Sequence, residues 1–142
     1  MKTRTCGILI GTLLSLPVLS CDSGGSSSSA QTAAVLAHHL QSVGAGDLDE
    51  IMADYAADAV LYTPNGALRG HDQIRPFFAG LPEILPADFW EKFEMIRQES
   101  DGEIAYIVWT AGSAAPLGTD TFVIRDGAII VQTFAAHMPP SP

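Results

Sequence analysis

Hydrophobic residues in the first third of the chain recur at the spacing of amphipathic helices. Across Ala30–Val43 they fall on one face at three- and four-residue intervals, with His39 inside this apolar stripe and His38 outside it. Asp47 then offers the short polar side chain that caps the start of a helix. The second, short helix that we predict after it has four apolar residues on one face: Leu48, Ile51, Met52 and Tyr55.

A strand, a tight turn and a third helix are predicted next. Asp58–Thr63 is short and rich in β-branched and aromatic residues, which is typical of a strand. Asn65–Gly66 supplies the positive φ angles of a tight hairpin turn and leads into a short strand, Ala67–Arg69. The apolar residues then return to helical spacing over about His71–Leu81, and Pro82 marks the start of a loop.

The rest of the chain alternates with period two, which predicts an antiparallel meander. Asp101–Gly102 and Asp126–Gly127 are favoured hairpin turns between its strands. Helices followed by such a meander indicate an α+β fold with the helices on one face of a sheet. Several strands are apolar on both faces, so we expect a second copy of the sheet to cover the other face in a homodimer. The four predicted strands are Asp88–Glu99, Glu103–Ala111, Gly118–Arg125 and Ala128–His137.

A leader precedes the folded domain. Met1–Arg4 is basic and Gly7–Leu19 is apolar without a charge, which is typical of a secretory signal rather than a membrane span. Cys21 resembles the lipidation site of a bacterial lipoprotein signal; the alternative is an ordinary secretory signal with a chance cysteine. We expect an exported lipoprotein, anchored on the periplasmic side or at the cell surface. The chain then divides into a signal peptide, 1–21; a Gly/Ser tether, 22–29; a domain, 30–138; and a flexible tail, 139–142.

Composition narrows the partners. The chain has seven basic and sixteen acidic residues, a formal net charge of −9. Nucleic acid is therefore not an expected partner, because phosphate binding depends on clustered Lys and Arg. Cys6 would leave with the signal and Cys21 would carry the lipid, so the domain has no disulfide and no catalytic thiolate. No His with Asp or Glu has the spacing of a metal site, and we expect neither a metal nor a cofactor.

Two segments carry a family resemblance: GDLDEIMADYAADAVLYTPNGALRGHDQIRPFF and DTFVIRDGAIIVQTFAAH. Together with the order of elements they resemble the nuclear transport factor 2-like superfamily, and within it the SnoaL-like branch, over about Gln31–His137. The resemblance implies a cone-shaped, strongly curved antiparallel sheet with three helices packed on its concave side and a pocket at the open end. Similar cones serve as isomerases, epoxide hydrolases, polyketide cyclases, dehydratases or binding modules, so the site must decide the function.

The resemblance also suggests where chemistry could lie. Ketosteroid isomerases of this superfamily use an Asp base, with a Tyr and a protonated Asp as hydrogen-bond donors. The base position corresponds to Thr63 here, and threonine cannot accept a proton near neutral pH. The tyrosine position corresponds to His39, and the protonated acid to Asp120. The resemblance therefore implies His39 and Asp120 as the catalytic candidates, a base and its orienter if they lie within hydrogen-bond reach.

Both candidates also have plainer interpretations. His39 could be a core histidine bonded to a backbone carbonyl, and Asp120 could lie exposed at a strand end. His137, in the last predicted strand, could be a pocket rim or an exposed strand end. The candidates for ligand contact are walls of the pocket rather than chemical groups: Tyr55, Thr63, Phe77, Trp90, Trp109 and Gln132.

Two functions are consistent with these residues. The first is a pocket that binds a small, largely apolar molecule, with catalysis unproven. The second is a cofactor-independent acid–base enzyme of the isomerase, hydrolase or cyclase type that uses His39 and Asp120. The lining of the cone distinguishes them, because two or more convergent titratable groups in a sizeable pocket favour the enzyme. A cone filled by aromatic side chains would exclude it.

Overall fold

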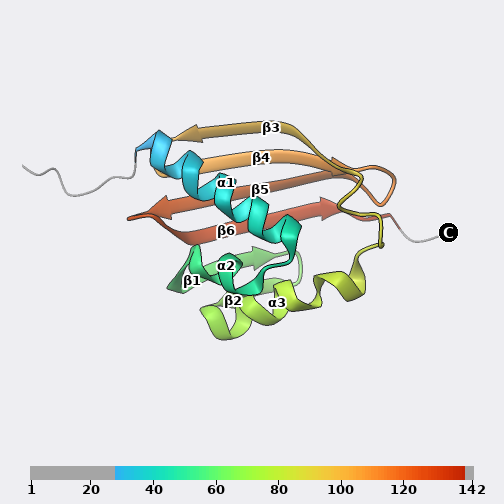
Figure 1. Cartoon of the computed structure of the whole chain (residues 1–142), viewed down its shortest axis with the longest axis horizontal. Helices are drawn as coiled ribbons and strands as arrows, with labels where there is room; N and C mark the ends of the chain where they lie inside the picture. Colours follow the sequence, from blue (N-terminus) through green and yellow to red (C-terminus); the bar gives the residue numbers. More distant parts are fainter. Residues whose placement is uncertain (1–27, 140–142) are drawn as a thin grey trace, which may run out of the picture.

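Three helices cover one face of a six-stranded sheet in the computed structural model, which describes residues 28–139 (Figure 1). The α+β fold that the sequence predicts is confirmed. The expected signal peptide, Cys21 and nearly all of the expected tether lie outside the described residues. Among the residues described, no helix is both long and apolar enough to cross a membrane.

The helices are α1 (Ser29–Ala45), α2 (Leu48–Ala53) and α3 (His71–Ile84). Asp47 caps α2 as expected, because its side chain accepts hydrogen bonds from the backbone N–H groups of Asp49 and Glu50.

Several boundaries differ from the sequence prediction, two of them at the ends of helices. Pro82 lies inside α3, because a proline in the last turn removes only one backbone hydrogen bond of the helix. Tyr55 is not on the second helix but is the first residue of a strand. The chain leaves α2 at Asp54, whose carbonyl accepts a hydrogen bond from the Ile129 N–H at 2.7 Å, so the next residues continue along the sheet.

The sheet is mixed. Its strands are β1 (Tyr55–Thr63), β2 (Gly66–Arg69), β3 (Phe93–Asp101), β4 (Ile104–Ala111), β5 (Ala115–Arg125) and β6 (Ala128–His137). They follow the spatial order β2-β1-β6-β5-β4-β3. All neighbours are antiparallel except β1 and β6, which run parallel, so the meander closes on the first strand of the chain.

Irregular register bends the sheet around the helices. The pairing shifts within β3, between β5 and β6, and between β1 and β6, and such bulges increase the local bend and twist of a strand. β3, the first strand of the predicted meander, also begins later than predicted, at Phe93 instead of Asp88. The preceding residues form turns, in which the Lys92 N–H bonds the carbonyls of Asp88 and Phe89.

The core lies between the helices and the sheet. On β4 every second side chain is buried, from Ala105 to Ala111, which is the period-two pattern of a strand with one covered face. In Figure 1, α1 runs across the long strands and α3 lies beside β1 and β2, in agreement with their contacts. Leu36 of α1 and Ile74 of α3 are fully buried there. No described element covers the opposite face of the sheet.

Gly118 on β5 leaves the space that a tryptophan ring of the neighbouring strand fills. It pairs directly with Trp109 of β4, and a Cβ atom at this position would overlap the Trp109 ring. The absence of a side chain at Gly118 therefore lets Trp109 lie flat against the sheet, where it is 5% exposed.

We predict that Gly118→Ala destabilises the protein, because the added methyl must displace a buried ring. The expected loss is about 1–3 kcal/mol in the free energy of unfolding, measured by urea denaturation. Gly80→Ala in α3 is the matched control: its new Cβ meets nothing within 4 Å, so stability should stay the same or rise by up to about 1 kcal/mol. An equal response of both variants would contradict the prediction.

Candidate functional site

A cavity of about 590 Å³ opens between the helices and one end of the sheet. It lies at the end of α1, at the turn between β1 and β2 and at the end of β6, as expected for the open end of a cone. Its wall is largely apolar and includes eight aromatic side chains: Phe77, Phe78, Phe89, Trp90, Phe93, Trp109, Phe122 and Phe134. Its polar side chains are few: His39, Thr63, Asn65, Asp120 and Gln132.

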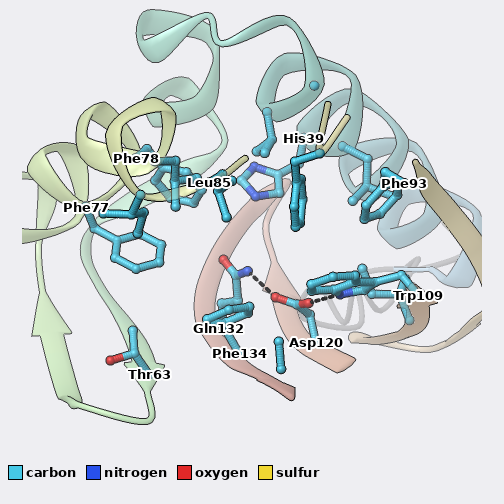
Figure 2. Close-up of a pocket in the computed structure, with 18 of the residues that line it drawn as sticks. His39, Thr63, Phe77, Phe78, Leu85, Phe93, Trp109, Asp120, Gln132 and Phe134 are labelled. Carbon is cyan, nitrogen blue, oxygen red and sulfur yellow. Dashed lines mark hydrogen bonds between the residues drawn. The ribbon is translucent and has the colours of Figure 1, made fainter. Parts of the chain in front are cut away.

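The Asp120 carboxyl group lies on the sheet side of this cavity, held by two neutral donors (Figure 2). The Trp109 indole N–H donates to Oδ2 at 2.8 Å, and the Gln132 amide donates to Oδ1 at 2.8 Å. The Tyr55 hydroxyl in turn donates to the Gln132 carbonyl oxygen. Asp120 is thus oriented by the strand on each side of β5.

The surroundings of Asp120 change its acidity. Its side chain is 6% exposed, and burial raises the pKa of this carboxyl group above its ordinary value. The two hydrogen bonds, together with any positive charge on His39, oppose that rise but do not cancel it. Asp120 is therefore a carboxyl group that can carry a proton at a higher pH than an exposed aspartic acid.

His39 lies on the helix side of the same cavity. Its ring, 1% exposed, packs edge-on against Tyr55, Phe78 and Phe122, at centroid distances of 5.2, 5.9 and 5.7 Å. Figure 2 shows one ring nitrogen turned toward Gln132 and Asp120. No direct hydrogen bond joins His39 to Asp120 among the described residues. The structure therefore brings the two candidates to opposite walls of one cavity, instead of making Asp120 the orienter of His39.

Five of the residues expected as pocket walls line the cavity: Thr63, Phe77, Trp90, Trp109 and Gln132. The Thr63 hydroxyl is engaged in the β1–β2 turn, where it donates to the Gly66 carbonyl at 3.0 Å. Tyr55 does not reach the cavity and lies behind Gln132. His137 is exposed at the end of β6.

Two sets of side-chain contacts around the candidate residues were not predicted from the sequence. Gln132 and Trp109, expected only as walls, are the groups that hold Asp120. Asp54, which received no role, has a carboxylate oxygen 3.4 Å from the Nδ1 atom of His39. Nothing in the spacing of Asp54 and His39 along the chain could have indicated this contact, because it depends on how α2 folds back on α1. Across residues 28–139, no group of three or more His, Cys, Asp or Glu side chains is arranged to hold a metal ion.

The raised pKa of Asp120 gives a pH-dependent stability. A group whose pKa is higher in the folded state contributes stability at low pH, and that contribution is lost as pH rises through the folded pKa. Asp120→Asn has no such group. We therefore predict that the wild-type protein loses stability relative to Asp120→Asn as pH rises from about 4 toward neutrality, in urea denaturation at several pH values. A difference that stays constant with pH, or changes in the opposite sense, would contradict the prediction.

Comparison with known proteins places this architecture. Residues 36–132 match the family model of the SnoaL-like domain, whereas no match was found among curated proteins.

Three solved structures illustrate the likeness. A SnoaL-like protein of unknown function from Burkholderia thailandensis is 19% identical, covers 80% of this chain and 99% of its own, and superposes with a TM-score of 0.65. A protein of Kribbella flavida, provisionally named a ketosteroid isomerase, is 20% identical over 80% of this chain and 82% of its own (TM-score 0.62). One of Sinorhizobium meliloti, provisionally named a polyketide cyclase, is 17% identical over 72% and 94% (TM-score 0.61). These structures share the fold, and the family match over most of the domain shows that the chain belongs to the SnoaL-like domain family.

Proposed function

We propose that the cavity binds a small, largely apolar molecule and that His39 and Asp120 act on it as base and acid, without a cofactor. One observation carries the proposal: two titratable side chains converge, from opposite sides, on an apolar cavity of about 590 Å³. Such a pocket can exclude water from most of a small ligand, and its few polar groups then fix the orientation of the ligand. The aromatic wall favours a flat, hydrophobic molecule.

The surroundings of each group suggest its role. A protonated Asp120 can donate its O–H to a substrate carbonyl oxygen, while each carboxyl oxygen still accepts its bond from Trp109 or Gln132. His39 can accept a proton from the carbon next to that carbonyl. The negative charge that develops on the oxygen is then stabilised by the Asp120 hydrogen bond. Return of the proton from His39 to a different carbon would complete an isomerisation.

Two proteins of similar fold have names that agree with this class of reaction. The Kribbella flavida and Sinorhizobium meliloti proteins are named for reactions at carbon atoms activated by a carbonyl group, and the same chemistry suits the His39 and Asp120 arrangement.

Binding without catalysis is the second candidate. Thr63 stands where an isomerase of this superfamily would carry its base, and its hydroxyl is tied into the β1–β2 turn. The cavity would then serve only to hold its ligand.

The enzyme proposal predicts a rank order among variants. The probe is a panel of cyclic ketones in D₂O, with deuterium incorporation at the α-carbon followed by mass spectrometry. His39→Gln should slow the exchange by about 10²-fold or more. Asp120→Leu should be slower than Asp120→Asn, because the amide keeps a neutral hydrogen-bond donor. Ligand binding is followed separately by tryptophan fluorescence. Binding without exchange would support the binding function, and a larger effect of Asp120→Asn than of His39→Gln would reverse the two roles.

We also propose that the domain is exported and anchored to a membrane through a lipid on Cys21. The sequence features that support this are the basic start, the uncharged apolar run and the Gly/Ser tether after the cysteine. In the bacterial host, radiolabelled palmitate should label the wild-type protein and not Cys21→Ser. The variant should also leave the membrane fraction. Equal labelling and fractionation of both proteins would contradict the anchor.

The uncovered sheet face supports a homodimer. Tyr106, Val108 and Val123 point to this face and are only partly buried, while Tyr62 on β1 is 45% exposed. Two such faces from two copies could cover each other. Native mass spectrometry of the protein purified from its host would report the dimer and any co-purified small molecule in the same spectrum.

A further inference from the structure

A second carboxylate lies near His39, on the side of the ring that faces away from the cavity. It connects His39 to residues at the protein surface. Asp54, at the end of α2, is 8% exposed. Its Oδ2 lies 3.4 Å from Nδ1 of His39, and its Oδ1 lies 2.8 Å from Nδ1 of His38. The next link is Glu50, whose carboxylate lies 3.4 Å from Nε2 of His38. His38 and His39, which are consecutive in α1, thus each have their Nδ1 atom close to one oxygen of the same buried carboxylate.

The atoms that face each other here have no alternative partner. His39 Nδ1 and Asp54 Oδ2 are buried and lie 3.4 Å apart, and neither makes a hydrogen bond to any described residue. Leaving both unsatisfied in the interior would be costly. A small shift of the Asp54 side chain or of the His39 ring would bring a proton on Nδ1 into line with Oδ2 and satisfy both atoms at once. Contacts of this kind are commonly long in a protein without substrate and shorten in the complex.

We propose that Asp54 is the positioning residue of His39: it holds the proton on Nδ1 and so presents the unprotonated Nε2 to the cavity. The inference deepens the proposed function and rests on it for its chemical meaning, since a base at Nε2 requires that tautomer. The same carboxylate would stabilise the imidazolium that forms when Nε2 takes a proton from the substrate. The proton taken up there stays on Nε2 until it is returned, and Asp54 takes up no proton in this step.

His38 holds Asp54 in place. It is half-exposed, and its pKa is raised by the hydrogen bond that it donates to Asp54, by the charge of Asp54 and then by Glu50. A charged His38 donates Nδ1–H to Oδ1, which restrains the carboxylate and leaves Oδ2 on the side of His39, 3.4 Å from its Nδ1 atom. The other ionisable groups that face these histidines are Tyr55 and Asp120, on the sheet side.

The backbone of Asp54 makes its own contacts, so the side chain can be changed without removing them. The N–H bonds the Ile51 carbonyl, and the carbonyl accepts from the Ile129 N–H at 2.7 Å. Asp54→Leu keeps these bonds and approximates the size of the side chain, while it removes both acceptor oxygens.

The test reads the histidine tautomers directly by ¹⁵N NMR of the purified full-length protein. In the wild type we expect Nδ1–H on His39. In Asp54→Leu this signal should be lost, and the pKa of His38 should fall. Glu50→Gln is the matched control, because it touches only His38: it should leave the His39 tautomer unchanged and lower the pKa of His38 less than Asp54→Leu does. An unchanged Nδ1–H tautomer of His39 in Asp54→Leu would overturn the proposal.

Asp54→Asn keeps the test decisive if the leucine variant does not fold. A carboxamide has one accepting and one donating group, so it cannot accept from both histidines at once. At least one of the two Nδ1–H groups must then lose its acceptor, so its ¹H and ¹⁵N chemical shifts should change, and unchanged shifts of both groups would overturn the proposal. Once an active substrate is found, Asp54→Leu should lower kcat by about 10- to 100-fold with little change in KM. Because the tautomer is measured without substrate, failure of this inference and failure of the enzyme proposal give different results.

Discussion

A carboxyl group buried in an apolar cavity is the constraint on which the functional end of this protein depends. Asp120 is tolerated there because β4 and β6 each supply a donor, and because Tyr55 holds the Gln132 amide in the orientation that Asp120 requires. The indole of Trp109 can reach Asp120 only where Gly118 leaves room for its ring. The polar network therefore fixes the shape of the apolar wall, and a change in either would disturb both.

The two catalytic candidates differ in how the chain holds them. Asp120 is held by neutral donors within one sheet, whereas His39 lies on a helix and has a carboxylate oxygen of Asp54 3.4 Å from its Nδ1 atom. Burial raises the pKa of the first group above its ordinary value, whereas the second has a carboxylate oxygen close to one of its ring nitrogens. One cavity thus contains two titratable side chains in different surroundings, without a direct hydrogen bond between them among the described residues.

The fold was largely accessible from the sequence, because amphipathic spacing, hairpin turns and the strand pattern are local properties of the chain. Boundaries failed where tertiary contacts decide them, as at Tyr55, which joins β1 because its neighbour bonds β6. His39 and Asp120 were identified as candidates through the family resemblance, and the structure places both in the lining of one cavity. The roles of Trp109, Gln132 and Asp54 were not accessible, since they depend on side-chain geometry between segments far apart in sequence.

The parallel pair of β1 and β6 has a consequence for the order of folding. Val60 pairs with Val131, and Leu61 with Gln132, so β1 can pair with β6 only when the last strand of the chain is available. Contacts between such distant segments carry a large loop-closure entropy and slow the folding of a domain. The meander of β3 to β6 can assemble from local hairpins, but the cavity closes only when β1 docks on it. The cavity is then among the last features that a newly made chain acquires.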